Sequence, residues 1–346
     1  MRLKKLLNFI ILIGTCSCID PVDIKVSSAG EKLVVDGLIS DSEGPYTVKL
    51  SKSLPFDNTQ VLPVYFVPES GAVVTIEDDL GNSFLFAEQD PGVYKSDPAA
   101  FRGEVGRAYK LKIITSGGVA YQSDPEMIVP VPPIDSLIYE YYKYPRFFIN
   151  SAGTPVVFDD YAFRLSVKVN DPSSERNYYR WKVDGIFEFF SLTDNPEIMQ
   201  CWAPLSRLEP GIMVTDDRFV DGKPFIEPLA IILYDRPTYF LAMVEQYSLS
   251  AEAFEYWNQV KKQQQNTGSI FDSTPAQIKG NIYRTDNTDE MALGYFGATA
   301  VTRDSILFQR FKASGLVSPT RPKDIIPGDC RFQEPNATNI KPPGFI

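Results

Sequence analysis

Four cysteines are the residues of this chain best suited to covalent chemistry, and they fall into two pairs. Cys16 and Cys18 follow an apolar run near the N-terminus, whereas Cys201 and Cys330 lie far apart in the body of the chain. The 346 residues include no histidine, which excludes Ser-His-Asp and Cys-His nucleophiles, histidine general bases and the usual zinc ligand sets. We therefore expect a non-enzymatic protein with no catalytic residue, no bound metal and no cofactor.

The N-terminal residues have the features of an export signal. A positively charged segment with Arg2, Lys4 and Lys5 comes first, and residues 6–14 then form an apolar run. A bilayer-spanning helix needs roughly 20 apolar residues, so this run is too short to span. It has the length of a signal-peptide core, about 7–15 residues. Residues 1–17 are therefore predicted to be a signal peptide.

The sequence Thr15-Cys16-Ser17-Cys18 after this run resembles the lipobox of bacterial lipoproteins, in which a small residue precedes a lipid-modified cysteine. Cys18 follows Ser17, a typical small residue, and is the favoured lipidation site. Cys16 follows the bulkier Thr15 and is the alternative. A lipoprotein cysteine carries at least two acyl chains, such as palmitate, and two chains hold a protein stably on a membrane. An ordinary secretory signal with an incidental cysteine pair is the competing interpretation.

Cys201 and Cys330 are the cysteines left for the mature body. An exported protein meets an oxidising compartment, and an even count favours a disulfide between them. Closing a loop of this length would stabilise the fold by about 4–5 kcal/mol in the chain-entropy model. The alternative is a pair of buried free thiols.

The charge balance limits the classes of partner. The chain has 34 basic and 44 acidic residues, a net charge of −10. Removal of the signal peptide takes three basic residues away, which leaves 31 basic residues against 44 acidic ones and a net charge of −13. Nucleic-acid binding needs a basic footprint and is not expected. An acidic, soluble body suits a protein held beside an anionic membrane surface.

Short β-rich segments dominate the chain and predict two domains. Residues 18–31 are polar and are predicted to be a tether. Beyond them, segments such as 46–51 alternate between apolar and polar side chains, the pattern of a half-buried strand. About seven such strands predict an immunoglobulin-like β-sandwich over residues 32–128. A proline-rich run at 129–134 cannot continue a sheet interior and predicts a stiff linker.

Residues 135–346 are predicted to form a larger β-rich domain with one helix near 250–265. Ser250 can cap that helix, and apolar residues recur along it at helical spacing. The helix residues expected to face the core are Phe254, Trp257 and Val260. The tail from residue 318 onward is rich in Pro, Gly and Asn and is expected to be irregular and laid over this domain. The predicted fold class is mostly β.

Three acidic groups could hold a cation or transfer protons. They comprise Asp286, Asn287, Asp289 and Glu290; Asp216, Asp217 and Asp221; and Asp159 with Asp160. Calcium prefers oxygen ligands, but the first group lacks the spacing and central glycine of an EF-hand, and solvated turns are favoured for the first two. The adjacent pair would point to opposite faces of a strand, which argues against a catalytic carboxylate pair.

Residues 139–148 contain an unusual density of aromatic side chains. Tyr139, Tyr141, Tyr142 and Tyr144 are the candidate partner-binding residues in this run. Tyr and Arg are enriched in interface hot spots, so one interpretation is an exposed surface for a protein or glycan partner. The simpler and favoured interpretation is a strand with a covered face.

Several segments together resemble a known family. They are residues 33–39 (LVVDGLI), 44–51 (GPYTVKLS), 254–257 (FEYW), 268–272 (GSIFD), 275–282 (PAQIKGNI) and 293–296 (LGYF). In this order they are similar to a family of Bacteroidota outer-membrane lipoproteins known as domain of unknown function 4249, and the resemblance covers nearly the whole mature chain. The C-terminal residues 341–346 (KPPGFI) depart slightly from the Lys-Pro-aromatic ending associated with the family.

The resemblance implies a role, because members are usually encoded beside TonB-dependent outer-membrane receptors. The expected function is a non-enzymatic accessory lipoprotein that binds the receptor or its substrate, with the membrane reached through the lipid anchor. Asp20 and Asp23 after Cys18 resemble acidic surface-export signals and favour the cell surface over the periplasmic face. The alternative is a structural or adhesive surface protein that binds glycans or other cells. A carboxylate-only hydrolase is a distant third hypothesis.

Overall fold

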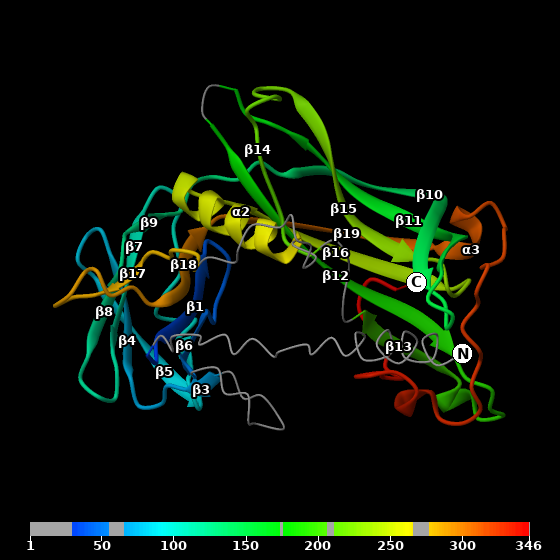
Figure 1. Cartoon of the computed structure of the whole chain (residues 1–346), viewed down its shortest axis with the longest axis horizontal. Coiled ribbons are helices and arrows are strands. Elements are labelled where there is room, and N and C mark those ends of the chain that lie inside the picture. Colours follow the sequence, from blue (N-terminus) through cyan, green and yellow to red (C-terminus); the bar gives the residue numbers. More distant parts are fainter. Residues whose placement is uncertain (1–29, 55–65, 174–175, 206–210, 266–276, 346) are drawn as a thin grey trace, which may run out of the picture.

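The computed structural model describes residues 30–54, 66–173, 176–205, 211–265 and 277–345. These residues form two β-rich bodies, with helix α2 (Ala251–Gln265) lying where they meet (Figure 1). The predicted signal peptide, most of the tether, and both Cys16 and Cys18 lie outside the described residues. None of the helices in the described ranges combines the length and the apolar character that spanning a bilayer requires.

The N-terminal body is one continuous sheet that folds over on itself. Its strands run in the order β17-β8-β7-β4-β5-β6-β2-β1-β18, with β3 beside β2 and β9 beside β7. The strands are β1 (Leu33–Ser40), β2 (Thr47–Ser53), β3 (Phe66–Pro68), β4 (Val73–Asp78), β5 (Ser83–Asp90), β6 (Val93–Ser96), β7 (Ala108–Ile114), β8 (Ala120–Ser123), β9 (Glu126–Met127), β17 (Ile282–Arg284) and β18 (Leu293–Thr299).

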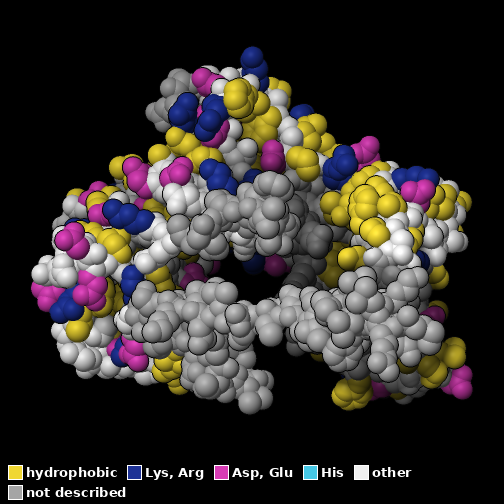
Figure 2. Space-filling view, viewed as in Figure 1, with side chains coloured by type: hydrophobic (Ala, Val, Ile, Leu, Met, Phe, Trp, Pro, Cys, Tyr) yellow, Lys and Arg dark blue, Asp and Glu magenta, His cyan; other side chains and the backbone are white. Residues whose placement is uncertain are grey.

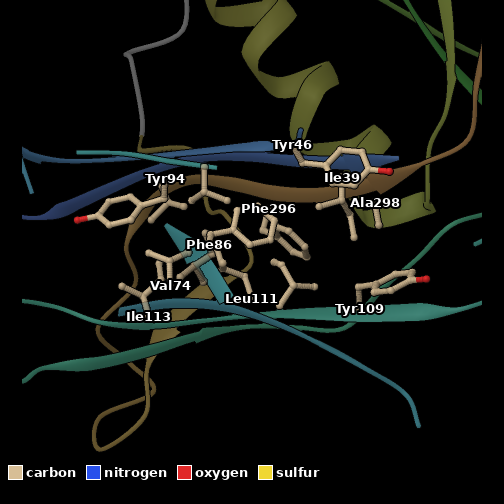
Figure 3. Packing of buried hydrophobic residues seen from close by; sticks show 14 of the residues in the cluster. Ile39, Tyr46, Val74, Phe86, Tyr94, Tyr109, Leu111, Ile113, Phe296 and Ala298 are labelled. Atoms are coloured by element: carbon tan, nitrogen blue, oxygen red, sulfur yellow. The ribbon is translucent and has the colours of Figure 1, made fainter. Parts of the chain in front are cut away.

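Alternating side chains of these strands fill the space between two layers. Ile39 and Ala298 point inward from the β1–β18 layer, and Leu111 and Ile113 point inward from the layer that contains β7 (Figure 3). All four side chains are at most 3 % exposed. The period-two pattern of the sequence therefore becomes the sandwich core, because successive residues of a strand face opposite sides of its sheet.

The last strand of this sheet comes from far along the chain. β18 pairs in parallel with β1, from Val34 beside Leu293 to Ser40 beside Thr299. β17 joins the opposite edge by pairing with β8. The predicted division at residues 129–134 is therefore incomplete, because residues 282–299 of the predicted second domain belong to the N-terminal sheet. Local periodicity identifies a strand but does not determine which sheet it joins.

Gly294 allows the close approach of β18 to β1. Its φ is +93°, a region that side chains other than glycine rarely adopt. A Cβ atom at this position would lie 1.9 Å from the carbonyl oxygen of Val35. Glycine at this position therefore lets the two strands pair at normal distance.

The second body consists of two facing sheets. One has the order β10-β11-β15 and the other β13-β12-β16-β19, with β14 beside β12. The strands are β10 (Ile134–Ile149), β11 (Pro155–Asn170), β12 (Tyr178–Phe190), β13 (Gln200–Leu205), β14 (Met213–Asp216), β15 (Pro224–Leu233), β16 (Tyr239–Ser248) and β19 (Val301–Gln309). Short helices are η1 (Pro196–Ile198), α3 (Arg310–Ala313) and η2 (Cys330–Phe332).

The proline-rich segment is hydrogen-bonded to the second body. The Val129 carbonyl accepts a hydrogen bond from Ser248 Oγ at 2.6 Å, and the Pro132 carbonyl accepts one from Gln246 Nε2 at 2.8 Å. Both donors lie on β16. Because proline supplies no backbone N–H, side chains of the neighbouring strand bind the carbonyl groups of this extended stretch.

Helix α2 begins where the sequence predicts. Ser250 Oγ accepts a hydrogen bond from the backbone N–H of Ala253 at 3.0 Å, as an N-cap does. Phe254 is buried in a small cluster with Tyr295 of β18 and Val214 of β14. Trp257 is partly buried. Its ring lies over the Arg180 guanidinium, whose carbon is 3.9 Å from the ring centre. The helix thus packs on strands of both bodies, and the mostly β fold class with one long helix is confirmed.

A buried carboxylate joins these elements. Glu126 of β9 is 3 % exposed and accepts hydrogen bonds from Ser250 Oγ at 2.8 Å, from Asn281 Nδ2 at 3.2 Å and from the Tyr295 hydroxyl. Within the described residues it has no basic partner. Burial raises the pKa of this carboxyl, partly offset by the three hydrogen bonds, and the nearby charge of Glu252 raises it further.

The raised pKa of Glu126 predicts a pH-dependent stability. The folded protein holds this proton at pH values where the unfolded chain has released it, so the free energy of unfolding should fall as pH rises from the ordinary glutamate pKa through the folded-state value. Glu126→Gln cannot ionise and should lose this component of the slope. Urea denaturation across pH 4–8 measures it, since the midpoint follows stability.

Two further variants control this experiment. Glu43→Gln changes an exposed glutamate of the same body and should keep the wild-type slope. Glu126→Ala leaves three buried donors without an acceptor and should lose about 1–3 kcal/mol or more. Equal slopes for wild type and Glu126→Gln would contradict the assignment.

Candidate functional site

One pocket of the described residues lies in the second body and is lined by residues of both sheets, of α3 and of the C-terminal tail. Figure 1 shows α3 at the end of this body far from the N-terminal sandwich. The volume of the pocket is about 290 Å³, near the lower end of the range for ligand pockets, ~300–1,000 Å³. The lining residues are Tyr144, Arg146, Phe187, Pro204, Leu205, Ile231, Ile232, Leu233, Asp235, Arg236, Phe240, Arg310, Lys323, Glu334 and Pro335.

Apolar side chains from both sheets supply much of this lining. Phe187 of β12, Phe240 of β16 and Ile232 of β15 belong to the main core of the second body and are nearly inaccessible to solvent. Leu233, at the end of β15, is 36 % exposed. The pocket is therefore a continuation of the hydrophobic core that opens to solvent where β15 ends.

Arg310 places a charged guanidinium in this core. It is 2 % exposed, and its Nη1 donates to Asp235 Oδ1 at 2.8 Å while Nη2 donates to Thr238 Oγ1 at 3.0 Å. Its own backbone N–H donates to the Thr238 carbonyl at 3.1 Å. Burial lowers the pKa of Arg310, and the Asp235 carboxylate opposes that shift. A buried charge is tolerated when it is paired and hydrogen-bonded in this way.

Arg236 connects the loop after β15 to the tail. Its guanidinium carbon lies 4.7 Å from the centre of the Phe187 ring. It forms an ion pair with Glu334 and a longer one with Asp235, at 3.6 Å. Lys323 also pairs with Glu334, at 3.3 Å. Two carboxylates are thus shared by Arg236, Arg310 and Lys323.

Arg146 is the fourth cation of the pocket. It comes from β10 and approaches the buried carboxylate of Asp160 at 3.5 Å. Its guanidinium carbon also lies 5.9 Å from the centre of the Phe158 ring. Four cations and two carboxylates therefore line the pocket, an arrangement suited to binding an anion.

The disulfide predicted between Cys201 and Cys330 is present, and it fixes the tail that supplies one wall of the pocket. The two Cα atoms are 5.8 Å apart, and the bridge joins β13 to η2 across 129 residues. Trp202, next to Cys201, exchanges two backbone hydrogen bonds of 2.9 Å with Thr338. The tail is laid over the second body as predicted, and Lys323 and Glu334 lie on either side of the bridge in sequence.

The structure separates the four candidate tyrosines of β10. Tyr139 stacks on Phe308 with ring centres 4.5 Å apart, and Tyr141 stacks on Tyr161 at 5.2 Å. The Tyr141 hydroxyl is buried and has no hydrogen-bond partner among the described residues. Tyr142 lies under the Arg164 guanidinium at 4.5 Å, and Tyr144 lines the pocket. A partner-binding role for these tyrosines stays a prediction.

The most exposed apolar side chains of this hairpin lie nearer its tip. Phe147 is 76 %, Ile149 73 % and Val157 54 % exposed. Phe147 is paired with Val157, and Ile149 with Pro155, across β10 and β11. Opposed residues of paired strands share one face of the sheet, so these side chains form a single apolar patch, which we call the hairpin-tip patch.

The acidic groups have structural partners. Asp286 and Glu290 both pair with Arg284, at 2.6 and 3.1 Å. Asp159 is exposed and pairs with Lys143 at 2.6 Å, whereas Asp160 is buried. The adjacent pair therefore faces opposite sides, as predicted.

One cluster of carboxylates partly matches the predicted group. Asp171, Asp217 and Asp221 have carboxylate oxygens within 4.8 Å of one another, whereas Asp216 pairs with Arg218 instead. Asp171 accepts hydrogen bonds from the Tyr179 hydroxyl at 2.6 Å and the Gly222 N–H at 3.0 Å. Asp217 accepts one from the Asn177 N–H at 2.7 Å. These bonds hold the turns together, and sequence spacing did not indicate Asp171.

Sequence reasoning missed the cations of the pocket. Arg146, Arg236, Arg310 and Lys323 come from four separate segments, so no motif contains them. Arg310 gave the best available signal, because it follows the apolar strand residues Ile306–Phe308 and is followed by Phe311. An arginine is almost never fully buried unless its charge is paired, and here Asp235 is the partner.

The comparison with family models gives one match. The model for the domain of unknown function DUF4249 matches residues 19–305. The chain belongs to the DUF4249 family. No curated protein matches the chain. The DUF4249 match includes Arg146 and Arg236 of the pocket and ends before Arg310, Lys323 and Glu334.

The disulfide predicts a measurable stabilisation. Replacing Cys201 and Cys330 together with alanine should lower the free energy of unfolding by about 4–5 kcal/mol, because the unfolded chain regains the freedom of a long loop. Chemical denaturation of the mature chain measures this loss. Reduction should destabilise wild type to a similar extent and leave the double variant unchanged. A double variant as stable as the oxidised protein would contradict the prediction.

Proposed function

We propose that this protein is a non-enzymatic lipoprotein of the outer membrane that acts as an accessory of a TonB-dependent receptor and transport system. The lipobox-like sequence at Cys16 and Cys18 supports lipid anchoring, and the DUF4249 match supports the family from which the receptor association is inferred. The acidic residues after Cys18 favour the cell surface, with the periplasmic face as the alternative.

The pocket of the second body is the observation that carries a binding role. Its two carboxylates, Asp235 and Glu334, both form ion pairs with cations of the lining. The apolar lining and the cations offer a place to bind a molecule. In an accessory of a transport system, such a pocket would receive a substrate.

The hairpin-tip patch offers a surface for the receptor. Exposed aromatic and aliphatic side chains gathered in one place commonly mark protein contacts, and Phe147 and Ile149 meet that description. The same patch also fits the second candidate function, a structural or adhesive surface protein. Binding to a glycan array or to other cells without a barrel partner would favour that alternative.

Lipidation is tested at its two candidate cysteines. Cys18→Ser should abolish incorporation of a palmitate analogue and release the protein from the membrane fraction, because the thiol that receives the lipid is gone. Cys16→Ser is the matched control and should keep both properties. The opposite result would assign Cys16, and labelling that persists in the double variant would contradict lipidation at this motif.

Receptor association is tested by co-purification from outer membranes extracted with mild detergent. Wild type should recover a TonB-dependent barrel, and Phe147→Ser with Ile149→Ser should reduce the recovery severalfold because the apolar contact is lost. Leu80→Ser is the matched control, since Leu80 is equally exposed, at 73 %, on the N-terminal body. Repeated recovery of no barrel by wild type would argue strongly against the proposal. Protease treatment of intact cells tests the face, because protection would place the protein in the periplasm.

A further inference from the structure

The pocket of the second body carries more positive than negative charge, in a chain whose net charge is −10. Four cationic side chains and two carboxylates line it. On the face seen in Figure 2, basic and acidic side chains are intermixed. A cleft with cationic walls and low-dielectric surroundings attracts anions.

Arg236 has hydrogen-bonding capacity that its protein partners leave unused. A guanidinium has five N–H donors, and among the described residues only Nη2 donates, to Glu334. The approach of Nη1 to Asp235 is 3.6 Å, which is longer than a hydrogen bond. The guanidinium carbon lies 4.7 Å from the centre of the Phe187 ring. The remaining donors can bind a carboxylate or phosphate, the groups that a guanidinium binds most strongly.

Arg146 and Lys323 are also incompletely paired. Arg146 approaches Asp160 at 3.5 Å, and Lys323 Nζ donates to Glu334 at 3.3 Å, the same carboxylate oxygen that Arg236 binds. Both distances are longer than those typical of charge-assisted hydrogen bonds, ~2.7–2.9 Å. An acidic group entering the pocket would give these cations the partner that the protein supplies only in part.

The apolar part of the lining sets a second requirement on the ligand. Leu205, Ile231 and Leu233, which are partly exposed, present carbon surface to the same cavity of about 290 Å³. A hydrated inorganic anion would gain nothing from that surface. A neutral hydrocarbon would cover the cations and leave their donors unpaired, which is costly away from water. A molecule with both an acidic group and an apolar group satisfies the whole lining.

Arg310 supports the pocket structurally and has no Nη atom free to bind a ligand. It is 2 % exposed, and Asp235 and Thr238 occupy both of its Nη atoms. Replacing it would remove the main ion-pair partner of Asp235, leave an empty space in the core and disturb the fold. Variants that test binding are therefore better placed at Arg236, at Lys323 or at the partly exposed Leu233.

We propose that this pocket binds an amphipathic organic anion, a carboxylate or phosphate carried by a short apolar group. The acidic head lies against Arg236, Arg146 and Lys323, and the apolar group packs against Leu205 and Leu233. The inference deepens the proposed function and rests on it only in taking the pocket as a binding site, since it names the class of ligand that the pocket accepts.

Calorimetric titration of the full mature chain with four probes tests this assignment. Cys18→Ser removes the lipid, so that neither lipid nor detergent competes. Octanoate or octyl phosphate should bind at least tenfold more tightly than both octanol and inorganic phosphate. Tighter binding of octanoate identifies a carboxylate source, and tighter binding of octyl phosphate identifies a phosphate source such as a lipid headgroup. Octanol binding as tightly as both octyl anions would overturn the cationic half of the proposal. Inorganic phosphate binding as tightly as octyl phosphate would overturn the apolar half.

Three variants locate the site. Arg236→Gln and Lys323→Met should each weaken binding of the preferred octyl anion about tenfold or more, and Leu233→Asp should weaken it as well, since it adds a negative charge at a partly exposed position. Lys49→Met changes an exposed lysine of the N-terminal body and should leave the affinity unchanged. Each variant is first compared with wild type by thermal unfolding. Unchanged affinity in all three folded pocket variants would overturn the location.

The two proposals fail in different ways. The titration contains no receptor, so absence of binding by any octyl anion would overturn the ligand class and leave receptor co-purification untouched. Absence of a co-purified barrel, with tight octyl-anion binding and the expected variant effects, would overturn the accessory role and leave the pocket assignment standing.

Discussion

The parallel pairing of β1 with β18 is the constraint on which the rest of the structure depends. It joins residues about 260 positions apart in the sequence, and it closes the N-terminal sandwich only after the chain has passed through most of the second body. The same return places Tyr295 against Glu126 and against the residues around α2. Contacts of such long range make folding slow, because the entropy of closing the loop precedes the gain from pairing. The N-terminal sheet is therefore incomplete without strands that follow the second body in sequence, so the two bodies are not independent folding units.

Local features of the fold followed from the sequence, whereas the long-range pairing did not. Alternating residues predicted the strands, Ser250 predicted the start of α2, and the cysteine count together with the expected compartment predicted the disulfide. The return of residues 282–299 to the first sheet left no local signal, because a strand pattern is the same whichever sheet receives it. Trp257 faces a core cluster as its helical spacing predicted, but the sequence did not indicate that its ring also lies over the Arg180 guanidinium.

The pocket could not have been assembled from the sequence, because its charges converge from β10, from the loop after β15, from α3 and from the tail. The structure shows that each carboxylate forms two ion pairs. Glu334 pairs with Arg236 and Lys323, and Asp235 pairs with Arg310 and Arg236. Buried ion pairs are weak contributors to stability, since desolvation offsets much of the attraction. This cluster at an apolar cavity is the observation from which the proposed binding of an amphipathic anion is argued.

The C-terminal tail contributes to the pocket but adds little to the sheets of the fold. The sheets of both bodies are built almost entirely from residues within the DUF4249 match, which ends at residue 305, whereas Lys323, Glu334 and Pro335 reach the pocket from beyond it. One covalent link and a short run of backbone contacts attach this wall to β13. A change of tail sequence can therefore alter charge and size on one side of the cavity while the strands keep their register. The strands of the two bodies and the tail wall of the pocket can therefore vary separately within one chain.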